Sequence, residues 1–158
     1  MKYIQLTKEQ LEELHHEFAQ FLATQQIDAK EWKDIKKNRP EVADEELNIF
    51  SDMVWEEVLT KAKYVEHFSK SSINLFYCTD GVIQRIMIKA NNSTIDLTSQ
   101  EGIQLLLNKP KSKDFEFFKG AKKYAKERNL EIFDLILKGA SISKEGALYQ
   151  NFEKFVKE

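Results

Sequence analysis

The sequence predicts an α+β fold in a single domain that spans residues 1–158. Apolar residues recur at helical spacing through the first 60 residues, alternate on both sides of Asp80-Gly81, and return to helical spacing toward the C-terminus. Such segregation of helices from strands is typical of α+β folds. The length suits one domain, and a composition of 42% hydrophobic and 32% charged residues is that of a globular chain. We therefore expect an N-terminal three-helix segment, a small mostly antiparallel sheet built on a hairpin, and C-terminal helices.

Two helices are predicted at the start of the chain. The first covers about residues 7–25, with Thr7 as its N-cap and Gln10 three residues later to complete a capping box. The second covers about residues 28–37 and is capped by Asp28. Both carry apolar side chains at steps of three and four residues, which gives each helix one face that packs on a core.

The longest predicted helix covers about residues 44–68. Its apolar residues spread over a wide arc, which is typical of a central helix that contacts more than one neighbour. The residues that define this arc are Leu47, Phe50, Val54, Val58, Val65 and Phe68.

A β-hairpin is predicted from residues 72–79 and 82–90. Both segments alternate, and Asp80-Gly81 between them is a strong hairpin signal. A lone hairpin is marginal in water, so residues 94–97 and 115–118 are the candidates for further strands. The turn predicts the pairs Ile73–Ile88, Leu75–Ile86 and Tyr77–Gln84 on the core face, and Asn74–Met87, Phe76–Arg85 and Cys78–Ile83 on the other.

A short helix is expected at residues 98–107, with Thr98 and Glu101 placed as a capping box. The following stretch, residues 108–114, contains Lys109-Pro110 and is predicted to be a loop.

Helical spacing then returns over residues 121–138, where Gly139 fits the position after a helix end, and over residues 144–156. Residues 139–152 resemble the turn and recognition helix of tetracycline-repressor-type regulators. The extra residue Glu145 rotates the second half of that pattern, so we interpret the segment as an ordinary helix start.

Charge is distributed unevenly. Residues 1–60 contain 7 Lys/Arg and 14 Asp/Glu, whereas residues 109–158 contain 12 and 8. A nucleic-acid-binding stripe at the start of the predicted 121–138 helix is one hypothesis, because phosphate contact needs a row of cations. A sequence pI near 6.0 argues against dedicated nucleic-acid binding. The candidate residues are Lys119, Lys122, Lys123, Lys126 and Arg128.

No catalytic residue, metal ligand or cofactor is predicted. Cys78 lies within a predicted strand, where a small buried hydrophobe is expected. His15 and His16 follow Glu12 and Glu13 by three residues, but wheel geometry does not direct both rings to one site. The sequence thus leans against an enzyme. If a site is assembled from distant residues, His67 and the carboxylates of the 44–68 helix are the first candidates.

The cellular setting follows from absences in the sequence. There is one cysteine, no apolar signal segment at the N-terminus, and no apolar run near the roughly 20 residues that span a bilayer. We therefore expect a cytoplasmic protein with no membrane association.

Several segments spread over most of the chain carry a family resemblance. They are QLTKEQ at 5–10, EFAQFLA at 17–23, IDAKEW at 27–32, IFSDMVW at 49–55, EHFS at 66–69, RN at 128–129 and IF at 132–133. Together these segments resemble a family of small soluble bacterial proteins with no assigned function. The resemblance implies a single domain and a bacterial setting, and brings no site residues.

The leading hypothesis for function is a protein-interaction or regulatory module whose partner is another protein or a second copy of the chain. Nucleic-acid binding and an enzyme site are the alternatives.

Overall fold

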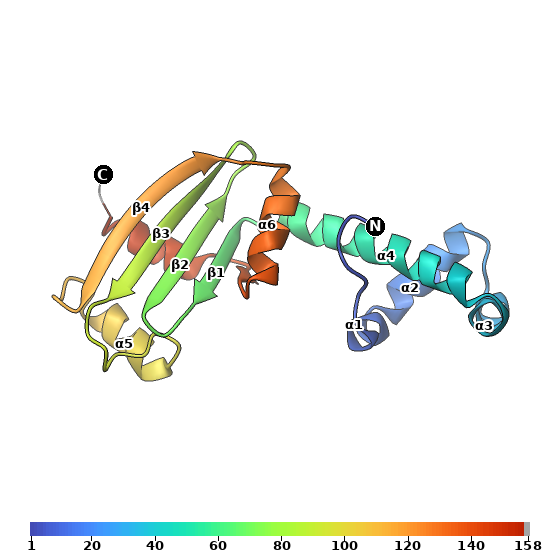
Figure 1. Cartoon of the computed structure of the whole chain (residues 1–158), viewed down its shortest axis with the longest axis horizontal. Coiled ribbons are helices and arrows are strands. Elements are labelled where there is room, and N and C mark those ends of the chain that lie inside the picture. The colour runs from blue at the N-terminus through green and yellow to red at the C-terminus, as the bar shows by residue number, and fades with distance from the viewer. Residues whose placement is uncertain (157–158) are drawn as a thin grey trace. The chain divides into compact units, whose positions relative to one another are not determined.

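The chain forms two compact units, Met1–Thr60 and Lys61–Glu158, in a computed structural model that describes residues 1–156 (Figure 1). We call them the N-terminal unit and the C-terminal unit. Helices build the first, and a five-stranded antiparallel sheet with further helices builds the second. The predicted α+β class is confirmed, with helices before and after a hairpin-based sheet. The expectation of one domain stays a prediction.

The helices of the N-terminal unit begin at the predicted caps. The Thr7–Gln10 capping box is present, and the Asp28 side chain accepts a hydrogen bond from the amide of Glu31. The first helix is interrupted at Leu14, where the backbone leaves helical geometry (φ −100°, ψ 22°). The helices are α1 (Lys8–Glu13), α2 (His15–Thr24), α3 (Ala29–Asn38) and α4 (Pro40–Lys61).

Aromatic side chains fill the core of this unit. Phe18 contacts Trp32 and Phe50, with ring centroids 5.2 and 5.0 Å apart, and Phe21 lies 5.4 Å from Phe50. Each such pair adds to the stabilisation from burial alone. The buried members of the cluster are Leu6, Phe21, Leu22 and Phe50.

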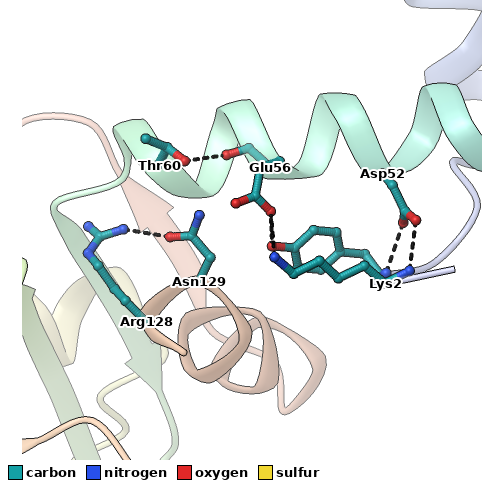
Figure 2. A network of polar contacts seen from close by, with 7 residues as sticks. Lys2, Asp52, Glu56, Thr60, Arg128 and Asn129 are labelled. Carbon is teal, nitrogen blue, oxygen red and sulfur yellow. Dashed lines mark hydrogen bonds and ion pairs between the residues drawn. The ribbon is translucent and has the colours of Figure 1, made fainter. Parts of the chain in front are cut away.

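The N-terminal segment is held to α4 by polar contacts. The amides of Lys2 and Tyr3 donate to the Asp52 carboxylate at 2.7 and 2.9 Å (Figure 2). Further along, the Leu6 amide donates to the fully buried Ser51 hydroxyl at 2.9 Å. These bonds satisfy backbone groups that no helix or strand accommodates.

The predicted 44–68 helix is wrong at both ends. α4 begins at Pro40, because proline is well suited to the first position of a helix. It ends at Lys61, and residues 64–68 form a strand, β1 (Tyr64–Phe68). Periodicity cannot distinguish a helix from a strand in so short an apolar run. Residues 64–68 form a strand because they pair with the next strand along the chain. No helix within residues 1–156 is long and apolar enough to cross a membrane.

The hairpin forms as predicted from β2 (Ser72–Cys78) and β3 (Val82–Ala90), and every predicted cross-strand pair is confirmed. The sheet order is β4-β3-β2-β1-β5, where β4 is Phe115–Lys123 and β5 is Ser141–Ser143. The start of β4 confirms the strand expected at 115–118.

One face of the sheet carries the main core of the C-terminal unit. Ile73, Leu75, Ile86 and Ile88 are at most 1% exposed, as predicted for that face of the hairpin. Two helices contribute to this core, α5 (Gln100–Asn108) through Leu106 and α7 (Ala147–Glu153) through Tyr149 and Phe152. In Figure 1 the red helix α7 runs behind the strands.

Two predictions for the segment directly after the hairpin need correction. Residues 94–97 form an irregular segment with turns at Thr94 and Leu97 instead of a strand, although Ile95 and Leu97 are buried in the core. The cap of α5 is Ser99 and not Thr98, because Thr98 donates to the Asp96 side chain. Residues 109–114 form the expected loop.

The largest correction concerns residues 121–127, which are not helical. β4 continues to Lys123 because it pairs with β3 along its whole length, and α6 covers only Arg128–Leu137. Gly139 follows the end of α6 with φ 105°, as predicted.

The last predicted helix, 144–156, is shorter than expected. β5 and a turn precede α7, which starts at Ala147. Tyr149 and Phe152 on α7 are 2% and 1% exposed. The segment that resembles a recognition helix therefore packs into the core, as the interpretation as an ordinary helix predicts.

Candidate functional site

A cavity of about 550 Å³ lies on the face of the sheet opposite the main core, next to α6. Its volume is typical of small-molecule sites. Strands β1 to β4 and helix α6 all contribute, and every lining residue belongs to the C-terminal unit. The side chains that matter most below are those of His67, Asn74, Phe76, Arg85, Glu131 and Lys138.

Strand register positions the floor of the cavity. Phe76 on β2 is paired with Arg85 on β3, which is paired in turn with Gly120 on β4. His67 on β1 is paired with Asn74 on β2 one step along. Residues paired across strands point to the same face, so these five positions form adjacent rungs of one surface.

At Gly120, on the edge strand β4, the floor of the cavity has no side chain. A Cβ built at Gly120 meets no atom within 4 Å, and the pairing of β3 with β4 runs through the position without interruption. The space beside Arg85 is therefore open above β4.

The two carboxylates of the cavity are both paired with lysines. Glu131 is only 9% exposed and accepts a hydrogen bond from the Ala125 amide at 2.6 Å. It also forms an ion pair with Lys122 at 3.3 Å. Asp134 pairs with Lys126. Their negative charges are thus balanced within the site.

The remaining cations have no carboxylate partner. Arg85 donates from Nε to the Asn74 Oδ1 at 2.8 Å and lies 5.8 Å from the centre of the Phe76 ring. The side chains of Lys138 and His67 make no hydrogen bond or ion pair with any residue in the described range 1–156. The cavity therefore carries excess positive charge within a mostly apolar lining.

The five predicted nucleic-acid-binding residues do not lie on one helix. Lys119, Lys122 and Lys123 are on β4, where alternation puts Lys122 on the cavity face and the other two on the opposite face. Lys126 lies in the turn before α6 and pairs with Asp134. A continuous cationic stripe is not formed, and nucleic-acid binding by these residues stays a prediction.

Arg128, the fifth of these residues, makes hydrogen bonds to backbone groups of the C-terminal unit. Its guanidinium donates to the carbonyl oxygens of Thr79 and Cys78, each at 3.2 Å, and to that of Ala62. It also donates to the Asn129 side chain at 2.8 Å (Figure 2). Arginine suits this role because its planar fork carries five donors.

Cys78 is buried as predicted, at 2% exposure. Burial raises the pKa of its thiol to about 11, so the nucleophilic thiolate is scarce at neutral pH.

The histidines differ partly from expectation. The His15 and His16 rings are both exposed, and their centroids lie 4.1 Å apart, closer together than the helical wheel suggested. Within residues 1–156, no three His, Cys, Asp or Glu side chains gather into a group suited to a metal ion.

Sequence reasoning named His67 and, for another role, Lys122, but missed the other cavity residues. It placed Phe76 opposite Arg85 correctly and did not recognise that face as a site. A glycine within a predicted strand was the available signal, had β4 been extended to Gly120. The positions of Glu131 and Lys138 depend on how α6 packs, which periodicity does not specify.

No curated protein and no solved structure matches the chain. One family model does, a family of unknown function (DUF6495), and it matches residues 1–157. Nearly the whole sequence, both compact units included, is thus accounted for by one family. The chain belongs to the DUF6495 family of unknown function.

Proposed function

We propose that this protein is a binding module that holds a small molecule in the cavity on the sheet of the C-terminal unit. The observation that carries the proposal is the cavity itself, about 550 Å³ in volume, with a mostly apolar lining that includes a few charged residues. Ligand sites combine a mostly apolar lining with a few placed polar groups, and this lining has that character.

The chemistry of the lining supports binding over catalysis. General acids and bases need groups that are free to exchange protons with a substrate. Both carboxylates here are engaged with lysines and the one thiol of the chain is buried, which leaves His67 and Lys138 as the lining groups without such a partner among the described residues. A regulatory role, in which the ligand changes how the protein acts on others, fits such a module. The buried free thiol also supports a reducing, cytoplasmic location.

A fragment screen followed by amide chemical shifts tests the proposal. Ligands of the cavity are expected to shift the amides of Asn74, Arg85 and Gly120 in a saturable way. The amides of α1 to α3 serve as the internal control and should stay unchanged. If no fragment shifts the cavity amides, or if shifts spread evenly over the chain, the proposal fails.

A second candidate function is self-association through α4. Ile49 and Met53 lie one helical turn apart and are 44% and 55% exposed. Exposed apolar side chains on one helix face favour a protein partner, here a second copy of the chain. Light scattering over a range of concentrations should show a dimer that Met53→Glu dissociates. A monomer at every concentration would remove this candidate.

A further inference from the structure

We infer that the cavity selects a small organic anion with a flat apolar body, and that Gly120 is the residue that makes room for that body. The inference rests on the proposed function and adds the class of ligand. Its three supports are the unbalanced cations, the fixed orientation of Arg85, and the open floor at Gly120.

The charges of the lining favour an anionic ligand. Glu131 and Asp134 are already paired with Lys122 and Lys126, so neither attracts a cation strongly. Arg85 and Lys138 line the same cavity without a carboxylate partner among the described residues. An anion entering the cavity gains attraction from both, whereas a cation meets repulsion.

Arg85 is oriented to receive an acid group. The Asn74 side chain occupies its Nε at 2.8 Å, and its Nη2 contacts only the Met87 sulfur at 3.9 Å. Its Nη1 has no acceptor within residues 1–156, so donors remain for a carboxylate or phosphate oxygen. Because Asn74 already restrains the guanidinium, less conformational entropy is lost when a ligand binds.

The apolar part of the lining favours a ligand with a flat, apolar body. The Phe76 ring lies beneath the Arg85 guanidinium, and Ile83, Leu135 and Ala140 add apolar surface. On the other side of Arg85, the Gly120 backbone is bare. A planar ring fits over that bare strand and keeps its acid group beside Arg85.

Gly120 itself points to a ligand. A glycine inside a strand weakens it, and it usually marks a bulge, a close backbone approach or a ligand. The ladder between β3 and β4 has no bulge at this position, and nothing approaches within 4 Å of a Cβ built there. The open space above Gly120 belongs to the cavity that this residue lines, so a ligand body has room there.

Three probes that share one ring system test the charge preference. We choose 2-naphthoate, neutral 2-naphthamide and protonated 2-naphthylmethylamine, with 2-naphthyl phosphate as a further anion. Titration calorimetry with the full chain should show the two anions binding at least about 10-fold more tightly than the amide, as expected for a charge-assisted hydrogen bond. The amine should bind most weakly.

Two variants and a matched control complete the test. Arg85→Gln should remove the preference for naphthoate over naphthamide. Lys89→Gln should leave it unchanged, because Lys89 lies on the same strand and face but outside the cavity. Gly120→Val should weaken every probe at least about 10-fold by filling the space, with a melting temperature no lower than that of the parent chain.

The outcomes separate this inference from the proposed function. If all probes shift the cavity amides with equal affinity, the anion preference is wrong and the binding site stands. If none shifts them while other fragments do, the ligand class is wrong and the binding site stands; if no fragment shifts them either, both are wrong. If Gly120→Val, folded by its amide spectrum, still binds normally, the role of Gly120 is overturned. Gly120→Ala provides the same comparison if the valine variant does not fold.

Discussion

The carbonyl oxygen of Cys78 accepts a hydrogen bond of 3.2 Å from Nη2 of Arg128, 50 residues further along the chain. The neighbouring carbonyl of Thr79 accepts from Arg128 Nε at 3.2 Å and from the Tyr124 hydroxyl at 2.6 Å. One side chain at the start of α6 thus satisfies the backbone where β2 ends. The cavity depends on this attachment, because α6 forms one of its sides.

Replacement of Arg128 by lysine should destabilise the protein although it keeps the charge. A lysine ammonium cannot span several carbonyls as a planar fork does, so partly buried acceptors lose their donors. We expect Arg128→Lys to lower the free energy of unfolding by about 1–3 kcal/mol in urea denaturation. The exposed Lys119→Ala is the control, expected within about 0.5 kcal/mol of the parent. Equal effects of the two changes would contradict the role given to Arg128.

Gly146 should tolerate no side chain. Its φ is +62°, and an added Cβ would lie 2.2 Å from Cγ of Tyr64. Tyr64 has little freedom to move, because its ring stacks on Tyr77 at 5.0 Å and contacts Tyr149 at 5.8 Å. Strain and overpacking together predict a loss of about 2–5 kcal/mol for Gly146→Ala by chemical denaturation.

A second glycine provides the comparison for Gly146. A Cβ at Gly81 meets nothing within 4 Å. Gly81→Ala should therefore cost much less than Gly146→Ala. A similar loss in both variants would mean that the contact with Tyr64 is not the cause.

Glu66 should make the protein less stable as pH rises. Burial raises the pKa of its carboxyl above the ordinary value of 4.5. The folded state therefore holds this proton more tightly than the unfolded state. Stability from this group is present below pH 4.5 and is lost as pH rises through the folded-state pKa.

Glu66→Gln removes that loss, because glutamine is neutral at every pH. Its melting temperature should exceed that of the parent at pH 7, and the difference should vanish near pH 4. The gain should stay below about 1 kcal/mol, because the side chain is partly exposed and water screens its charge. Glu101→Gln, at an exposed position in the first turn of α5, is the control and should give a smaller gain at pH 7. A gain that persists unchanged at pH 4 would exclude the titration of Glu66 as its origin.

Cys78 should resist thiol reagents in the folded protein. Burial removes access to it and raises its pKa to about 11, and both effects slow the reaction. At pH 8 a disulfide reagent should modify almost no thiol in native buffer and one thiol per chain in 6 M guanidinium, roughly the range that unfolds even very stable domains. Modification in native buffer at the rate seen in denaturant would show that the thiol is accessible.

The hairpin and the helix caps were predictable because their causes are local. Asp80-Gly81 specifies the turn, and a two-residue turn determines the register of the strands beside it. The Thr7 and Asp28 caps need only residues three positions away. For such elements the physical cause lies within a few residues of its effect.

The errors share the opposite cause. Residues 64–68 and 121–123 are strands because a neighbouring strand offers backbone partners, and in the second case that strand begins about 40 residues earlier. Local spacing in both segments is compatible with a helix. Cross-strand pairing made both segments strands and not helices, and the spacing of apolar residues does not reveal such pairing.

The sequence alone determined the α+β class, the hairpin register, the buried thiol and the opposite charges of the two ends of the chain. Only the tertiary structure decided that Arg128 binds backbone carbonyls and that Arg85, Lys138 and Gly120 surround one cavity. The physical reason is distance along the chain: propensity, capping and turns act over a few residues. A site is made by side chains from several strands and a helix, and their meeting depends on the packing of the whole sheet with α6.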